Sequence, residues 1–212
     1  MEKLKFYTVL NESGIEQIHE NSLKILAETG VSIQCDEMLA FLQKAGLPVD
    51  MNKRLVRFPE DVIEAAMKAA PGEIELFDRK GDPEALLGHE GARKQTYTAY
   101  GNDAVFMLDF GQDERREGTK QDQAQCTFVA DYCDSIDIVG IEVMPQDVPK
   151  EATLLHALDA AFNNTTKHIY CAPDSRETAR AAFEIAWTAS GAENPETHPP
   201  ISSQVSPTSP LT

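Results

Sequence analysis

The most constraining feature of the sequence is a regular alternation of apolar strands and amphipathic helices that begins at Ile136. It has five predicted segments, three strands separated by two helices: 136–143, 150–163, 167–171, 174–191 and 200–205. Ile136, Ile169 and Ile201 occupy similar places in the three strands and are 33 and 32 residues apart. Strand, helix and strand in this order are typical of right-handed βαβ units, so we expect a parallel sheet.

Two α/β architectures fit this alternation, a small three-stranded open sheet or the opening of a closed (β/α)8 TIM-type barrel. A complete barrel needs on the order of 250 residues, whereas only 77 residues follow Ser135. An open parallel sheet would leave its last strand with an uncovered edge, and Pro207 to Thr212 predict no closing helix. We therefore predict an incomplete barrel that contains its first three strands.

The chain before these strands has a different character. Apolar residues recur at three- and four-residue steps in three segments, which predicts helices at 11–30, 36–46 and 59–71. The first should bury one stripe that includes Ile15 and Ile18, and Asn11 and Asp36 are suitable N-cap residues. Short extended runs separated by glycines follow. We therefore expect a helical cap over 1–72, a β-rich section over 73–118 and the opening βα units over 119–212. Thr119 and Asp122 have the spacing of a capping box, which predicts the start of a helix.

Charge and composition exclude several classes of function. The chain has 19 Lys and Arg against 35 Asp and Glu, a formal net charge of −16, and no basic run to attract nucleic acid. It has no signal-peptide pattern and no apolar stretch of roughly 18 residues, so we expect a cytoplasmic protein that is not in a membrane. The four cysteines form no C-x-x-C pair, which favours reduced thiols. The glycine-rich phosphate loop and the nucleophile elbow are absent from the sequence.

Five runs of sequence, in this order and separation, resemble the amino-terminal half of the trimethylamine methyltransferase family. They are the runs at 15–31 (IEQIHENSLKILAETGV), 57–62 (RFPEDV), 134–140 (DSIDIVG), 163–167 (NNTTK) and 206–211 (SPTSPL). The resemblance covers nearly all of this chain but only about half of a family member.

The resemblance implies a (β/α)8 barrel that moves a methyl group from a tertiary or quaternary amine to the cobalt of a separate corrinoid protein. Family members act on trimethylamine or on betaine-like amines, and the trimethylamine enzyme carries pyrrolysine at a position beyond Thr212. A quaternary ammonium already has a neutral amine as its leaving group, whereas a tertiary amine must first be activated. By itself this chain would bind no corrinoid and would be inactive, and the full-length form would be a homo-oligomer.

Barrel enzymes place their chemistry at the carboxyl ends of the strands. Glu142 follows the first predicted strand there, and its carboxylate suits a cationic substrate, although a solvated or salt-bridged loop residue is the alternative. Gln204 and Ser206 end the third strand, and we predict that they also bind substrate. No catalytic residue can be named from this chain.

Aromatic rings can hold a methylated ammonium by cation–π attraction. Tyr97 and Tyr100 are the one compact aromatic pair beside a glycine-containing turn, and Tyr100 is the candidate for substrate binding. Three residues apart on a strand, the two rings should face opposite ways, so packing is the alternative role. His168 and Cys171 have the same spacing, which argues against a shared zinc ion, and we predict no metal site.

Two other functions remain open at this stage. A non-enzymatic α/β binding or interaction module could use the same three strands as a compact fold. Another barrel enzyme, such as an aldolase or a pterin methyltransferase, would share the architecture without the quoted runs.

Overall fold

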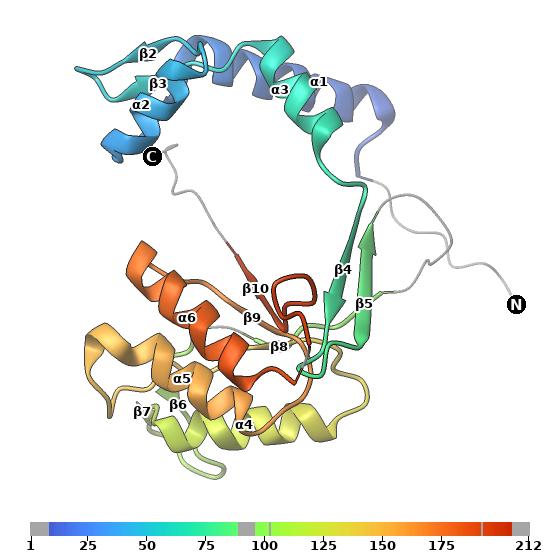
Figure 1. Cartoon of the computed structure of the whole chain (residues 1–212), viewed down its shortest axis with the longest axis vertical. Helices are drawn as coiled ribbons and strands as arrows, with labels where there is room; N and C mark the ends of the chain where they lie inside the picture. Colours follow the sequence, from blue (N-terminus) through green and yellow to red (C-terminus); the bar gives the residue numbers. More distant parts are fainter. Residues whose placement is uncertain (1–8, 89–95, 102, 192, 205–212) are drawn as a thin grey trace, which may run out of the picture. The chain divides into compact units, whose positions relative to one another are not determined.

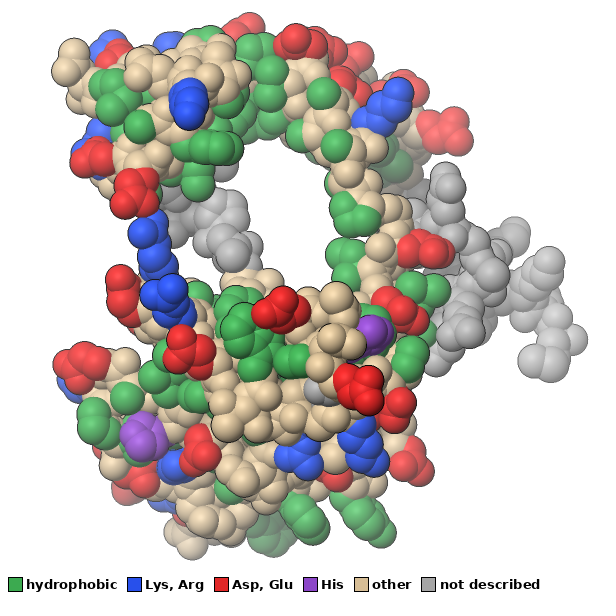
Figure 2. All heavy atoms as spheres, viewed as in Figure 1, with side chains coloured by type: hydrophobic (Ala, Val, Ile, Leu, Met, Phe, Trp, Pro, Cys, Tyr) green, Lys and Arg blue, Asp and Glu red, His purple; other side chains and the backbone are tan. Residues whose placement is uncertain are grey.

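The computed structural model describes residues 9–88, 96–101, 103–191 and 193–204 of the chain. The chain divides into two compact units, the first ending at Ala70 and the second beginning at Pro71 (Figure 1). On the face shown in Figure 2, Asp and Glu side chains are scattered over both units, in keeping with the acidic composition. Within the described residues, no helix combines the length and the apolar character that crossing a membrane requires.

The first unit contains three helices and a small antiparallel sheet. Its helices are α1 (Glu12–Lys24), continued by one π-helical turn η1 (Ile25–Thr29), α2 (Asp36–Lys44) and α3 (Glu60–Ala69). Its strands, in the order β1-β3-β2, are β1 (Val31–Ser32), β3 (Leu55–Val56) and β2 (Val49–Asp50). The predicted helices are confirmed. Leu39 and Val56 are the fully buried apolar residues among those described in this unit.

Two details of this unit differ from the predictions. Asn11 caps α1 by accepting a hydrogen bond from the Gly14 amide, but the N-cap of α2 is Cys35, and Asp36 instead pairs with Arg54 at 2.8 Å. Leu23 is the buried residue of α1, whereas Ile15 and Ile18 are more than half exposed. The predicted buried stripe is therefore wrong for the described residues, because periodicity identifies an apolar face without supplying what covers it.

The second unit is built on a parallel sheet with the strand order β10-β9-β8. Its strands are β8 (Val139–Gly140), β9 (Ile169–Cys171) and β10 (Ile201–Ser203), in parallel register with Val139 and Ile201 both opposite Ile169. The helices α4 (Lys120–Tyr132), α5 (Thr153–Phe162), which follows the short turn η2 (Lys150–Ala152), and α6 (Arg176–Ala189) connect the strands. The predicted parallel βαβαβ order and the mixed α/β class are thus confirmed.

A fourth segment extends this sheet. Residues 98–101 and 103–104 run parallel to β8, with bridges between Ala99 and Ile138 and between Ala104 and Val143. The Ala104 amide donates to the Glu142 carbonyl at 2.8 Å, and the Ala104 carbonyl accepts from the Met144 amide at 2.9 Å. This segment lies within 73–118, which the sequence predicted to be a separate β-rich section. It instead extends the parallel sheet beside β8.

The core of the second unit lies between the sheet and the helices α4, α5 and α6, which lie side by side on one of its faces (Figure 1). Alternation along the strands directs Val139, Ile141, Ile169 and Ile201 to this helical layer. The opposite face of the sheet is called the inner face here. It carries Ile138 and Tyr170, which pack on the hairpin of β4 (Glu73–Phe77) and β5 (Pro83–Gly88).

Polar contacts hold the crossover connections in place. The Thr119 and Asp122 side chains complete a capping box at the start of α4, as predicted. At the carboxyl end of α4, the Lys167 ammonium donates to the carbonyls of Ala130, Cys133 and Ile136 at 3.0, 2.9 and 2.6 Å. The run 163–167 therefore joins the end of α4 to the start of β9, because one cation satisfies three carbonyls left open after the helix.

Candidate functional site

The inner face at the carboxyl end of the sheet carries an unpaired carboxylate. Glu142 is half-buried, and its Oε2 atom is buried without a hydrogen-bond partner. Burial raises the pKa of this carboxyl. An unpaired carboxylate in such a place attracts a cation, which would restore the solvation that burial removes.

Gly101 provides the space for this carboxylate. A Cβ at Gly101 would lie 2.0 Å from Oε2 of Glu142, so no side chain fits there while Glu142 keeps its position. Two residues later Asp103 has a φ of 62°, a left-handed conformation that Asp tolerates better than most residues. Asp103 thus brings a second carboxylate to the carboxyl end of the sheet, near Tyr170 and Cys171.

Tyr170 lies on the same face, one strand away. It is opposite Gly140 in the register of β8 and β9, and a Cβ at Gly140 would lie 2.8 Å from its Cε1 atom. The Tyr170 hydroxyl donates to the Tyr100 carbonyl at 3.2 Å. Burial, followed by the charges of Asp103 and Glu142, raises the pKa of Tyr170.

His168, two residues before Tyr170, has contacts that give it a structural role. Its ring is 1% exposed, with Nδ1 2.8 Å from the Phe77 carbonyl and Nε2 3.0 Å from the Ser202 hydroxyl. These contacts fix a neutral ring that donates to the carbonyl and accepts from the hydroxyl, and burial lowers its pKa. His168 thereby ties β4 to the parallel sheet.

The residues considered for zinc do not converge. His168 faces the inner side, whereas Cys171 belongs to the core under the helices. In the described ranges, no group of three or more His, Cys, Asp and Glu side chains could hold a metal ion.

The predicted substrate-binding residues have different surroundings. Glu142 is on the inner face, and Gln204 is exposed two residues beyond Ser202, which also points inward to His168. Tyr100 packs against the helical core, and burial and a hydrogen bond with Cys126 raise its pKa. Tyr97 packs on the opposite side, against the β4–β5 hairpin, as the spacing predicted. Ser206 lies outside the described residues.

Sequence reasoning did not single out Tyr170, Gly140 or Asp103. Alternation from Glu142 along the first predicted strand points to Gly140, and a parallel register then brings in the residue before Cys171. Asp103 had a weaker signal, because its one mark in the sequence is a glycine two residues earlier.

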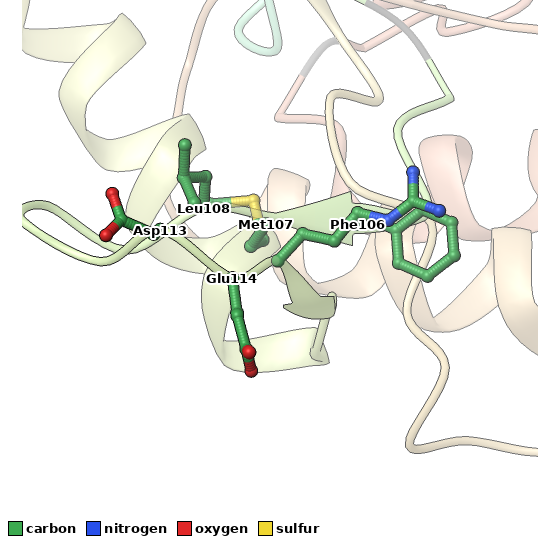
Figure 3. A pocket seen from close by; sticks show the side chains of 6 residues that line it. Phe106, Met107, Leu108, Asp113 and Glu114 are labelled. Carbon is green, nitrogen blue, oxygen red and sulfur yellow. The ribbon is translucent and has the colours of Figure 1, made fainter.

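A hairpin follows the 98–104 segment at the same end of the sheet. It consists of β6 (Phe106–Met107) and β7 (Arg116–Glu117), and the charged residues of 109–117 lie in it. Figure 3 shows Phe106, Met107 and Leu108 on its outgoing side and Asp113 and Glu114 on the return, around an open depression. The Arg115 guanidinium lies 4.1 Å from the centroid of the Phe106 ring.

Arg116 anchors this hairpin to the start of α4. It makes two parallel hydrogen bonds to Asp122, each 2.7 Å, and two to Asp109, each 2.8 Å. The guanidinium lowers the pKa of both carboxyl groups. Because such bidentate pairs fix orientation, the hairpin is held at the carboxyl end of the sheet.

Comparison with known proteins identifies the family. The family model for trimethylamine methyltransferase matches residues 1–212. The chain belongs to the trimethylamine methyltransferase family. The resemblance of the five sequence runs is thereby confirmed.

The names of curated relatives in this family refer to more than one amine substrate. The chain is 29% identical to a trimethylamine methyltransferase of Desulfitobacterium hafniense over 195 residues, 92% of this chain and 38% of the relative. It is 28% identical to a glycine betaine methyltransferase of the same species, over 85% of this chain and 36% of the relative. A proline betaine:corrinoid methyltransferase of Eubacterium limosum is 31% identical over 59% of this chain and 24% of its own. The chain therefore spans less than half the length of these relatives.

Proposed function

We propose that this chain forms the amino-terminal part of an enzyme that moves a methyl group from a tertiary or quaternary amine to a corrinoid protein. The family match over 1–212 carries this proposal. The relatives' names support the substrate class, because they include trimethylamine, glycine betaine and proline betaine, and one also includes corrinoid.

We further propose that the parallel sheet is the opening of a (β/α)8 barrel. The 98–104 segment would be its first strand and β8, β9 and β10 the next three, each connected by a helix on the outer face. The predicted boundary of the barrel at 119 would then move to the start of that segment. The inner face, with Glu142 at the carboxyl end, would line the barrel interior where such enzymes place their chemistry.

In this proposal Glu142 binds the ammonium group of the substrate. Gln204 and Ser206 follow β10 and would contact the rest of the substrate, whereas Tyr100 would contribute through its carbonyl, which holds the Tyr170 hydroxyl. The corrinoid of a separate partner protein would supply the nucleophile that accepts the methyl group. Since the substrate loses its positive charge during transfer, Glu142 favours the bound substrate more than the transition state and serves binding rather than catalysis.

A chimera tests this function. The matching part of the Desulfitobacterium trimethylamine methyltransferase is replaced by this chain, and methylation of a corrinoid protein is followed by its absorbance with trimethylamine, glycine betaine and proline betaine. We expect transfer from one of the three amines and no transfer by the 212-residue chain alone. For Glu142→Gln we expect a raised KM together with a raised kcat, because the lost interaction favours the bound substrate over the transition state. A folded chimera that transfers from none of them would refute the proposal.

A further inference from the structure

The inner face places an aromatic ring and an unpaired carboxylate on neighbouring strands. Tyr170 on β9 is opposite Gly140, and Glu142 is two residues further along the strand that contains Gly140. Residues two apart on a strand project to the same face, so the ring and the carboxylate share one side of the sheet.

The position of the ring is fixed on three sides. Its hydroxyl is bound to the Tyr100 carbonyl, its Cε1 atom lies against Gly140, and it packs on the cluster of Leu76, Ala85 and Ile138. A ring held in this way loses little conformational freedom when a ligand binds to it.

The carboxylate has the complementary property. Oε2 of Glu142 is in contact with Gly101 and has no donor in the described part of the chain. A metal ion would need several oxygen ligands, and a primary ammonium would need three acceptors at short range. A fully methylated ammonium has no N–H to donate, and an aromatic face together with one unpaired negative charge satisfies it.

We propose that Tyr170 and Glu142 together bind the methylated ammonium headgroup of the substrate, with Tyr170 as the aromatic wall. This inference rests on the proposed function and deepens it, because it names the two side chains that select methylated cations over neutral molecules of the same shape. Tyr170 takes the place that sequence reasoning gave to Tyr100, whose ring packs under the helices.

Tetramethylammonium tests this on the 212-residue chain by NMR of labelled tyrosine rings, of which there are five. We expect a saturable shift of the Tyr170 signals with tetramethylammonium and none with the neutral isostere tert-butanol. For the variants, binding is measured on the ligand, by saturation transfer to the methyl protons of tetramethylammonium. Tyr170→Leu should weaken binding roughly 2- to 30-fold, the range of one cation–π contact. Tyr170→Phe should retain it, because the ring remains, and Glu142→Gln should weaken it.

Tyr132→Leu is the matched control, since Tyr132 is exposed on α4 and should leave binding unchanged. An unshifted Tyr170, equal binding by Tyr170→Leu and the unmodified chain, or equal shifts with tert-butanol would each overturn the inference. If tetramethylammonium does not bind at Tyr170 but the chimera transfers methyl groups, this subsite alone is refuted. Tetramethylammonium binding at Tyr170 without any methyl transfer would refute the proposed function alone.

Discussion

Oε2 of Glu142 occupies the space that a side chain at Gly101 would need, with 2.0 Å between it and a Cβ built on the glycine. Gly101→Ala should therefore displace the carboxylate and destabilise the second unit by about 1–3 kcal/mol, the usual cost of overpacking. Urea unfolding measures this loss. Glu142→Ala in the same chain should recover most of it, whereas Gly72→Ala, where a Cβ meets nothing within 4 Å, should change little. Additive effects of the Gly101 and Glu142 substitutions would contradict the contact.

The raised pKa of Glu142 predicts a pH-dependent cost. The folded chain holds this proton more tightly than the unfolded chain, so the cost of burying the charge is absent below the unfolded pKa of about 4.3 and grows as pH rises through the folded pKa. Glu142→Gln should therefore be more stable than the unmodified chain at about pH 7 and lose this advantage near pH 4. Unfolding free energies across this range measure the difference. Exposed Glu16→Gln should show no such trend.

His168 should make the second unit sensitive to acid. Burial lowers its folded pKa, so the unfolded chain takes up the proton first, and stability present above the unfolded pKa of about 6.5 is lost below it. Urea unfolding at several pH values should show a slope that His168→Gln reduces. His19→Gln, whose side chain is 43% exposed, should keep the slope. An unchanged slope in His168→Gln would show that another group is responsible.

The exposed side of α4 should cause self-association. Phe128, Val129 and Tyr132 are 62%, 58% and 83% exposed on one side of this helix, and contiguous apolar surface of this kind favours association. Light scattering during size exclusion should show assemblies that Phe128→Glu with Tyr132→Glu disperses. The control pair Gln121→Glu with Gln125→Glu adds the same charge at exposed positions of α4. A concentration-independent monomer with one sharp thermal transition would instead favour a compact binding module.

The parallel order could be predicted because β8, β9 and β10 belong to apolar runs at a constant spacing. The pairing of the segment beside β8 could not, since it lies in a run with short extended stretches and glycines, and a hairpin separates it from α4. Its place depends on backbone hydrogen bonds such as that from the Tyr100 amide to the Ile138 carbonyl. Side-chain pattern contains little information about such bonds.

The candidate site, like the fold, could be predicted only in part. Position at the end of an apolar strand made Glu142 a candidate from sequence alone, and the structure places its carboxylate on the inner face without a hydrogen-bond partner for Oε2. Tyr170 required the register of two strands, which places it opposite Gly140. The surroundings of the Tyr100 ring, which packs against the helical core, could not be predicted, because a tyrosine near a glycine looks the same in sequence whether it faces a ligand or a helix.

The three carbonyls that share the Lys167 ammonium have a consequence for how this fold is assembled during synthesis. They belong to the end of α4 and the approach to β8, whereas the lysine enters about thirty residues later in the chain. A nascent polypeptide that stops at Phe162 has both the helix and the strand but not the cation that locks their junction. This junction is thus completed by the following repeat, and it can close only after Lys167 has emerged from the ribosome.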